Sequence, residues 1–390
     1  MEKRGGLFLL GLATVVLFLL PCHDTVTAQP SSTASKLPQS GFTFTNGKYC
    51  PNVTYASPIS KASLYHLATT GANWVALVVT QYQRTHNSTQ IFPLYTPQHS
   101  DRPPWYYTFV TATEEELSDA IHQAHALGLR VMLKPHVDLT EDPDPGMWRG
   151  DIGRGFTEEQ WAEWFRSYEQ FLMPYVRLAA RTGVEQFSLS CELIEASKQD
   201  AHWRQLIAKV RDSYSGTLTD SANWGWPNAT GGEITNKTWW DAVDIIGVDE
   251  YYHLLPEVPN PTVEQLEAAW IPIIEQLRKV SQRFDSKPVV FTEIGYCSGL
   301  CQRGRRPSSS DLRQQAVHYE AALRVMMKES SWILGAFWWN WPTDAAFGGY
   351  SDDCMAQAYK PVEDVLRKYY QATLPVPPPP SYPPSCLCTL

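Results

Sequence analysis

The chain alternates regularly between segments that favour β-strands and segments that favour helices, and this alternation constrains its fold more than any other feature. Eight strand-favouring segments are expected at residues 41–45, 73–80, 129–136, 185–192, 216–223, 244–251, 288–293 and 333–341. Helical patterns fill most of the intervals, and a long loop rich in Tyr and Pro is expected over 81–112. Eight successive strand–helix units predict an α/β fold, a single (β/α)8 TIM barrel. An open doubly wound sheet is the alternative, but such sheets more often carry a Gly-rich phosphate loop, which this sequence lacks.

The two ends of the chain differ in composition from the part between them. Residues 1–28 combine a basic start, an apolar run from Leu7 to Leu20 and small residues up to Ala28. They predict a cleaved signal peptide, with a retained signal anchor as the alternative, because the run is short for a stable transmembrane helix. Residues 29–40 are expected to be a disordered arm, 41–372 the catalytic barrel and 373–390 a Pro-rich polyproline II tail. The tail resembles hydroxyproline-rich wall glycoproteins, so it is either an attachment to the cell wall or a plain spacer.

Composition narrows the partners and the compartment of the mature chain. A formal net charge of −9 argues against nucleic acid as a partner, because nucleic-acid binding needs basic patches. Apart from the signal, no segment is apolar enough to span a bilayer, so no stable membrane association is expected after its removal. Sequons suited to glycosylation in a secreted chain occur at Asn52, Asn87, Asn228 and Asn236. The chain is therefore expected to be secreted, either extracellular or in the cell wall.

Cysteine usage agrees with an oxidising compartment. Removal of Cys22 with the signal leaves an odd number of cysteines, so at least one thiol is free or paired between chains. Cys297, Cys301 and Cys354 fall in loops on one side of the predicted fold, and at least one of them is expected to be disulfide-bonded. His and Cys never group at zinc-ligand spacing, so no metal is expected.

Two of the predicted strands end in a glutamate. The β-favouring run from Val289 to Thr292 leads into Glu293, and the segment 185–192 ends in Glu192. A buried parallel strand is nearly all apolar, so a carboxylate at its end is either a helix-capping charge or a site residue. Because the carboxyl ends of all barrel strands meet at one mouth, where ligands bind, we expect the two glutamates to lie close together.

Side-chain alternation along each strand predicts which other residues face the mouth. The inward set comprises Lys134 and His136, with Asp138 just beyond them, then Ser188 and Ser190, then Thr219, Ser221 and Asn223, and finally Gly247, Asp249 and Tyr251. The same alternation turns Cys191 toward the helices as a buried thiol and places Trp338 inside with Ala336. Core packing gives no reason for so many polar residues at the carboxyl ends of strands, so a binding site is predicted there.

A pair of carboxyl groups at the mouth suits glycoside hydrolysis. One group has to be protonated near neutral pH, while the other stays ionised as a nucleophile. A hydrogen bond from Tyr251 is expected to orient Glu293, and Asp249 ranks behind the glutamates because alternation buries it more deeply. The 15 Trp residues fit both an aromatic core and a sugar-stacking cleft. The candidate substrate-binding residues are Lys134, His136, Asp138, Asn223, Trp224, Trp338 and Trp341.

Seven short motifs occur in order along the predicted barrel. They are Gly71-Ala-Asn-Trp-Val75, Lys134-Pro-His-Val-Asp138, Trp148-Arg149-Gly150, Ala222-Asn223-Trp224, Ile246-Gly247-Val248-Asp249, Phe291-Thr-Glu-Ile-Gly-Tyr296 and Phe337-Trp-Trp-Asn-Trp341. On these motifs the chain from about Gly41 to Tyr370 resembles glycoside hydrolase family 113 of clan GH-A. The resemblance implies a retaining endo-β-1,4-mannanase that needs no cofactor and acts on β-mannan or glucomannan. It also implies that Glu192 is the acid/base and Glu293 the nucleophile.

Cys191 departs from the pattern of many clan members, which place Asn before the acid/base, where it contacts the sugar 2-hydroxyl. The substrate contacts near this position therefore stay open. An exo-acting β-mannosidase or another β-glycosidase of the clan is the alternative among enzymes. A non-catalytic carbohydrate-binding wall protein on the same scaffold is the alternative outside them, because fold alone does not fix function. The presence of both glutamates favours an enzyme.

Overall fold

The computed structural model describes residues 36–46, 53–96, 98–99, 108–141, 144, 146–225, 232–299, 306–344, 348–349 and 352–381. The chain divides into a unit of residues 1–35 and a unit of residues 36–390, and the second is described below. The predicted signal peptide, most of the predicted arm and the end of the tail lie outside the described residues, as do Cys22, Asn52, Asn228, Cys301, Cys386 and Cys388. Among the described helices, none combines the length and the apolarity of a membrane span.

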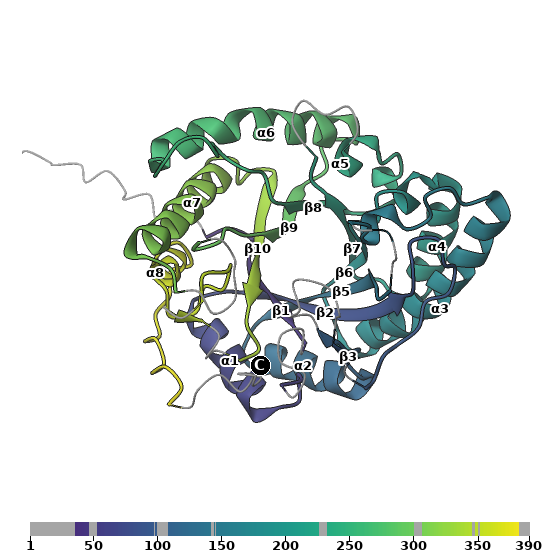
Figure 1. Cartoon of the computed structure of the whole chain (residues 1–390), viewed down its shortest axis with the longest axis horizontal. Coiled ribbons are helices and arrows are strands. Elements are labelled where there is room, and N and C mark those ends of the chain that lie inside the picture. The colour runs from purple at the N-terminus through teal and green to yellow at the C-terminus, as the bar shows by residue number, and fades with distance from the viewer. Residues whose placement is uncertain are drawn as a thin grey trace, which may run out of the picture. The chain divides into compact units, whose positions relative to one another are not determined.

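Eight parallel strands close into a barrel in the order β1-β10-β9-β8-β7-β6-β5-β2 (Figure 1). Their bounds are β1 Gln39–Thr45, β2 Trp74–Gln83, β5 Arg130–Leu139, β6 Gln186–Cys191, β7 Thr217–Asn223, β8 Ile245–Glu250, β9 Val289–Ile294 and β10 Ile333–Trp341. These strands confirm the predicted (β/α)8 barrel, although β1 already begins within the segment predicted as an arm. A short hairpin of β3 (Gln98–His99) and β4 (Thr108–Phe109) lies in the segment predicted as a loop.

Helices surround the barrel (Figure 1). They are α1 Pro58–Thr69, α2 Glu114–Ala126, α3 Glu158–Thr182, α4 Asp200–Ser213, α5 Glu233–Asn236, α6 Val263–Arg283, α7 Ser309–Lys328 and α8 Pro361–Tyr369. The sequence signals at their ends act as expected. Thr113 and Thr157 each form a reciprocal capping box, with Glu116 and Gln160 respectively. Gly183 ends α3 in the left-handed conformation, with φ of 72°.

Apolar side chains pack in two layers, one inside the barrel and one between the strands and the helices. The inner cluster consists of Trp74, Ala76, Met132, Ile245, Val290 and Phe337. The outer layer is much larger and includes the aromatic stripe of α3, in which Trp161, Trp164 and Tyr168 are buried. Most of the inner cluster lies near the starts of the strands. The barrel interior at the carboxyl ends of the strands is therefore left to polar side chains.

Four strand pairs of the barrel shift register, and one of them is the pair of β1 and β10, which shifts between Phe42 and Phe44. Two other shifts fall between Ser188 and Cys191 where β6 pairs with β7, and between Val248 and Asp249 where β8 pairs with β9. The pairing of β10 with β9 shifts on both sides of Ala336. A one-residue slip turns the following side chains to the opposite face of a sheet. Beyond these points, simple alternation no longer predicts which residues face the mouth.

Candidate active site

Glu293 lies buried on β9 and is held by two strong donors. The Tyr251 hydroxyl donates to Glu293 Oε2 at 2.7 Å, and Lys134 Nζ donates to Glu293 Oε1 at 2.5 Å. The predicted contact between Tyr251 and Glu293 is therefore present. Both bonds use the oxygens as acceptors, which is the role of an ionised carboxylate.

Lys134 also binds Asp249, so one ammonium group joins two carboxylates. Its Nζ lies 2.9 Å from Asp249 Oδ1 and 3.0 Å from Oδ2, and the Thr292 hydroxyl donates to Oδ1 at 2.7 Å. Burial lowers the pKa of Lys134, but the adjacent Asp249 and Glu293 raise it above its ordinary range. Burial and the charge of Glu293 raise the pKa of Asp249 to about 6, against the opposing effect of Lys134.

Both Lys134 and Asp249 are fully buried. The depth of Asp249 agrees with its predicted rank behind the glutamates. Lys134 was predicted to contact substrate; in this structure its buried ammonium group donates hydrogen bonds to the two carboxylates. Lys134 instead supplies the positive charge that lets Asp249 and Glu293 lie side by side.

Glu192 follows the end of β6 and is half-buried, with a left-handed backbone at φ of 55°. Its N–H donates to Ser221 O at 2.8 Å, and Asn223 Nδ2 donates to its Oε1 at 2.8 Å. Burial, together with the charges of Asp249 and Glu293, raises the pKa of Glu192 to about 8, while Arg149 and the Asn223 bond oppose the rise. A carboxyl group with its pKa raised to this value favours the protonated form near neutral pH, and it lies beside Glu293, whose two oxygens accept hydrogen bonds.

Arg149 begins a 3-10 turn, Arg149–Asp151, and connects several mouth residues. Its guanidinium donates to Asp138 Oδ1 at 2.8 Å, to His136 Nδ1 at 3.2 Å and to Cys191 Sγ at 2.9 Å. The predicted site residues His136 and Asp138 therefore meet at one cation. Arg149 was not among the predicted site residues, although the Trp148-Arg149-Gly150 motif pointed to it.

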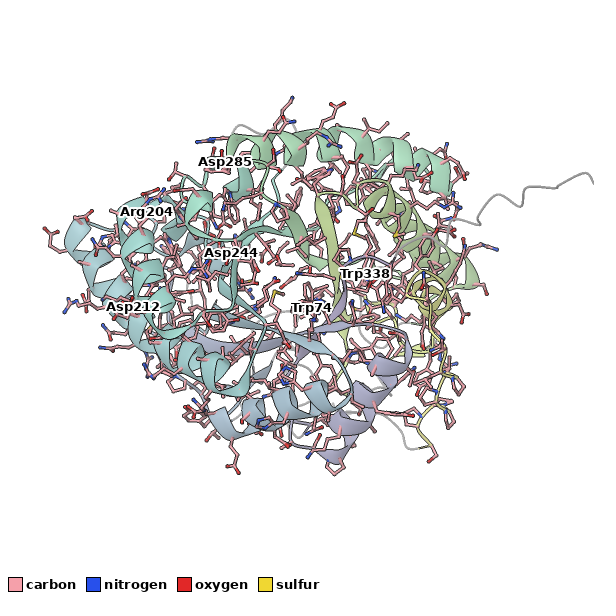
Figure 2. The ribbon with its side chains drawn as sticks, turned by 180° about the vertical axis from the view of Figure 1, so that it is seen from behind. Trp74, Arg204, Asp212, Asp244, Asp285 and Trp338 are labelled. Carbon is pink, nitrogen blue, oxygen red and sulfur yellow. The ribbon has the colours of Figure 1, made fainter. Side chains whose placement is uncertain are left out.

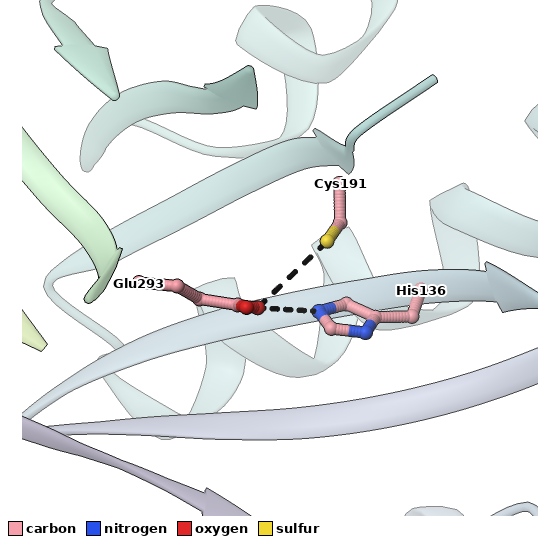
Figure 3. A group of neighbouring side chains, drawn as sticks. All are labelled: His136, Cys191 and Glu293. Atoms are coloured by element: carbon pink, nitrogen blue, oxygen red, sulfur yellow. Dashed lines mark hydrogen bonds and ion pairs between the residues drawn. The ribbon is translucent and has the colours of Figure 1, made fainter. Parts of the chain in front are cut away.

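Cys191 points into the barrel mouth, not toward the helices as strand alternation predicts. The register shift between Ser188 and Cys191 explains this error. The buried sulfur lies 3.3 Å from Asp249 Oδ2 and 3.9 Å from Glu293 Oε1, and Figure 3 shows the thiol and the His136 ring directed at the Glu293 carboxylate. Burial raises the pKa of Cys191 well above its ordinary value, so the thiol is neutral. Ser190, predicted to face inward, donates instead to Asp220 Oδ1 at 2.6 Å.

Two groups of potential metal ligands share Cys191. One consists of His136, Cys191 and Glu293, and the other of Cys191, Glu192 and Asp249, with the ligand atoms of each group within 4.8 Å of one another. Lys134 and Arg149 already donate hydrogen bonds to Glu293, Asp249 and Cys191 in this space.

The tryptophans of β10 differ from their predicted roles. Trp338 is fully buried on the helix side, where it stacks on Tyr319 of α7 at 4.1 Å between ring centroids and donates to the Tyr370 hydroxyl. Figure 2 labels Trp338 and, from the inner cluster, Trp74. Trp341 is also fully buried and donates to Ser63 of α1. Neither ring is a stacking floor for sugar, because both belong to the outer core layer.

Trp339 is the tryptophan of β10 that reaches the mouth. Its half-buried ring lies nearly parallel to the His136 ring, with centroids 6.5 Å apart and an interplanar angle of 11°. The register shifts around Ala336 bring it there in place of Trp338. Trp224, a weaker candidate, is half-buried and packs edge-on against Tyr252.

Comparison with known proteins gives a consistent result. The family model described as Glycoside Hydrolase Family 113 matches residues 43–356. A GH113 β-1,4-mannanase complex is 25% identical, with a TM-score of 0.66 over 87% of this chain and 100% of the other. The GH113 β-mannanase AaManA from Alicyclobacillus acidocaldarius, in complex with ManMIm, is 29% identical, with a TM-score of 0.67 over 87% of this chain and 98% of the other. Among curated protein sequences, no significant match was found.

Proposed function

Since the chain belongs to glycoside hydrolase family 113 and is a glycoside hydrolase, we propose that it is a secreted, retaining endo-β-1,4-mannanase. Support for the substrate comes from the similar structures, which are described as β-1,4-mannanases of the same family. The observation that carries the mechanism is the unequal state of the two glutamates. Glu192 is a protonated acid with its pKa raised to about 8, whereas Glu293 accepts hydrogen bonds on both oxygens.

In the first step, a carboxylate oxygen of Glu293 attacks the anomeric carbon of the sugar. The bond from that carbon to the glycosidic oxygen breaks, and Glu192 gives its proton to the leaving oxygen. Tyr251 and Lys134 hold the attacking carboxylate in place. The product of this step is a glycosyl ester on Glu293, with Glu192 now a carboxylate.

In the second step, Glu192 takes a proton from water, and the resulting oxygen attacks the same anomeric carbon and releases Glu293. Retaining enzymes hold their two carboxyl groups about 5–5.5 Å apart, too close for a water to attack directly. Two inversions leave the product with the β configuration of the substrate.

Secretion is the second part of the proposal. The N-terminal signal pattern and the exposed sequon residues Asn87 and Asn236 support it. The disulfide-bonded state of Cys297 is consistent with an oxidising compartment, extracellular or in the cell wall. Mass spectrometry of the secreted protein is expected to find an N-terminus near Gln29, glycan on at least one sequon and a disulfide at Cys297. Unmodified asparagines together with free thiols would contradict the assignment.

The enzymatic proposal is tested by digestion of β-mannan, glucomannan, xylan and β-glucan. We expect the viscosity of β-mannan to fall faster than reducing ends accumulate, and early proton NMR spectra to show the β-anomer. Glu293→Gln is expected to abolish cleavage, because no nucleophile remains. Equal rates on all four polymers would reject the mannan assignment, and release of monosaccharide alone would indicate exo action. An early α-anomer would reject retention.

A further inference from the structure

Behind the strand that carries Asn223 lies a group of three buried charged residues that the mechanism does not use. Asp220, Glu233 and Lys237 are at most 1% exposed. Lys237 Nζ binds Asp220 Oδ2 and lies 3.0 Å from Glu233 Oε1. The same ammonium lies over the rings of Trp239 and Trp240, at 4.4 Å and 4.6 Å from their centroids. We call these three residues the rear triad.

The rear triad contacts both strands that hold Glu192. On β6, Ser190 Oγ donates to Asp220 Oδ1 at 2.6 Å. On β7, the backbone N–H of Asn223 donates to Glu233 Oε2 at 2.8 Å, while the Asn223 side chain donates to Glu192 Oε1, also at 2.8 Å. A continuous chain of hydrogen bonds thus runs from Glu233 through Asn223 to Glu192.

Two glycines that approach each other closely lie next to Glu233. Gly225 has φ of 104°, a left-handed conformation, and a Cβ there would lie 2.5 Å from Gly232 Cα. Gly225 and Gly232 therefore lie against each other, and the residue after Gly232, Glu233, starts α5 beside the end of β7. Asn223 is the last residue of β7, where a strand has fewer neighbours to fix its peptide group.

From these contacts we propose that Glu233 is a positioning residue for the acid/base Glu192 and acts through Asn223. The role rests on the proposed function, because it assigns proton transfer to Glu192. Glu233 fixes the Asn223 peptide, the peptide fixes the amide side chain, and the amide holds the Glu192 carboxyl toward the leaving oxygen. Glu233 itself touches no substrate, since it is fully buried on the helix side of the barrel.

The proposal has a consequence for titration of the site. The hydrogen bond from Asn223 opposes the rise in the pKa of Glu192 that burial causes. If the Asn223 amide moves and this hydrogen bond is lost, the pKa of Glu192 rises further. Glu192 then gives up its proton less readily, and proton donation matters most when the leaving group is poor.

The experiment compares Glu233→Ala, which removes the acceptor, with Glu233→Gln, which keeps a carbonyl acceptor but removes the charge. Two rates are measured: kcat on β-1,4-mannan, and the burst rate of glycosylation on a dinitrophenyl β-mannobioside, whose leaving group needs no acid. Loss of one well-placed hydrogen bond is expected to lower kcat of Glu233→Ala on mannan by about tenfold. The burst rate and the Glu233→Gln variant are expected to stay within about twofold of the wild type.

Glu250→Ala is the matched control. Glu250 is also a fully buried glutamate that accepts a backbone N–H, from Tyr252 at 2.8 Å, but on β8. Any loss in this variant is expected to be the same on both substrates, because it reflects general loosening of the barrel. A second measurement, carbon-13 NMR titration of the Glu192 carboxyl, needs no catalysis, and in Glu233→Ala its pKa is expected to rise.

The outcomes distinguish the proposed function of the chain from the positioning role of Glu233. A wild-type protein that leaves mannan intact would reject the proposed function, while the NMR titration would still test the positioning role. Equal losses on both substrates in Glu233→Ala, or a loss in Glu233→Gln as large as that in Glu233→Ala, would overturn the positioning role. An unchanged pKa of Glu192 in Glu233→Ala would overturn it as well.

Discussion

Replacing Lys134 with methionine removes the only positive charge that touches both Asp249 and Glu293 among the described residues. Its Nζ lies 2.5 Å from Glu293 Oε1 and 2.9 Å from Asp249 Oδ1, and the side chain is fully buried. Methionine fills a similar volume without charge, so the change leaves two buried carboxylates facing each other. Breaking a buried ion pair on one side costs about 3–5 kcal/mol, and we expect Lys134→Met to lose this much free energy of unfolding at about pH 8.

The pH dependence of this loss distinguishes charge from packing. A proton on one carboxyl group replaces the missing positive charge, so the two carboxyl groups hold one more proton in the folded variant than in the folded wild type. As the pH falls, the gap in unfolding free energy is therefore expected to narrow by up to about 1.4 kcal/mol per pH unit. The gap narrows in this direction because the pKa of one carboxyl group is raised in the folded variant. Protonation of that group stabilises the folded variant below this pKa, and the stabilisation is lost as the pH rises through it. Protonation also disables the nucleophile, so kcat/KM on mannan at neutral pH should drop sharply.

The assay is urea unfolding of both proteins at about pH 8 and about pH 5, with Lys61→Met as the control. Lys61 pairs with Asp119 at 2.9 Å on the surface, with side chains 44% and 41% exposed. A surface pair of this kind contributes about 0–1 kcal/mol, so the control should barely change the unfolding midpoint. A Lys134→Met loss below about 1 kcal/mol, or one that is the same at both pH values, would refute the reasoning.

Trp339→Ala is expected to lower kcat/KM on mannan with little change in the urea midpoint, whereas Trp338→Ala should cost about 3–5 kcal/mol of unfolding free energy; the reverse pattern would contradict the placement of the two rings. Activity should fall as the pH rises through about 8, the pKa of Glu192, because the acid must carry its proton; a kcat/KM profile without this limb would argue against Glu192. Burial also raises the pKa of Glu250 to about 8, so its contribution to stability is complete below the ordinary carboxyl range and is lost as the pH rises through that value. In the wild type the urea midpoint should fall as the pH rises from weakly acidic to alkaline, and Glu250→Gln should make this fall smaller. An equal fall in the variant and the wild type would exclude this contribution of Glu250.

The fold was predictable because it depends on patterns that are local in the sequence. Strand-favouring runs, capping boxes such as that of Thr113, and the left-handed Gly183 each act within a few residues. The meeting of Glu192 and Glu293 at one mouth was predictable for a similar reason, since barrel closure brings the strand ends together whatever their separation. The contact from Tyr251 to Glu293 followed from the same argument.

The finer placement of the site residues was not predictable, because it depends on register between neighbouring strands. Cys191 and Trp338 were assigned to the wrong faces, and each lies beyond a register shift. A shift is set by the pairing of two strands that are far apart in sequence, so alternation within one strand cannot reveal it. The partners of Arg149 were hidden for a related reason, since that residue lies on a turn outside the strands.

The left-handed backbone at Glu192 has a consequence for the evolution and engineering of this chain. A residue with a Cβ pays about 1–2 kcal/mol for φ near +55°, a cost that glycine avoids. The glutamate also lies half-buried beside two other carboxylates, which its raised pKa reflects. Selection for stability alone would therefore tend to replace the residue that we propose as the proton donor. Heat-tolerant variants drawn from a library would be enriched in inactive ones at this position, unless each round of selection also demanded turnover.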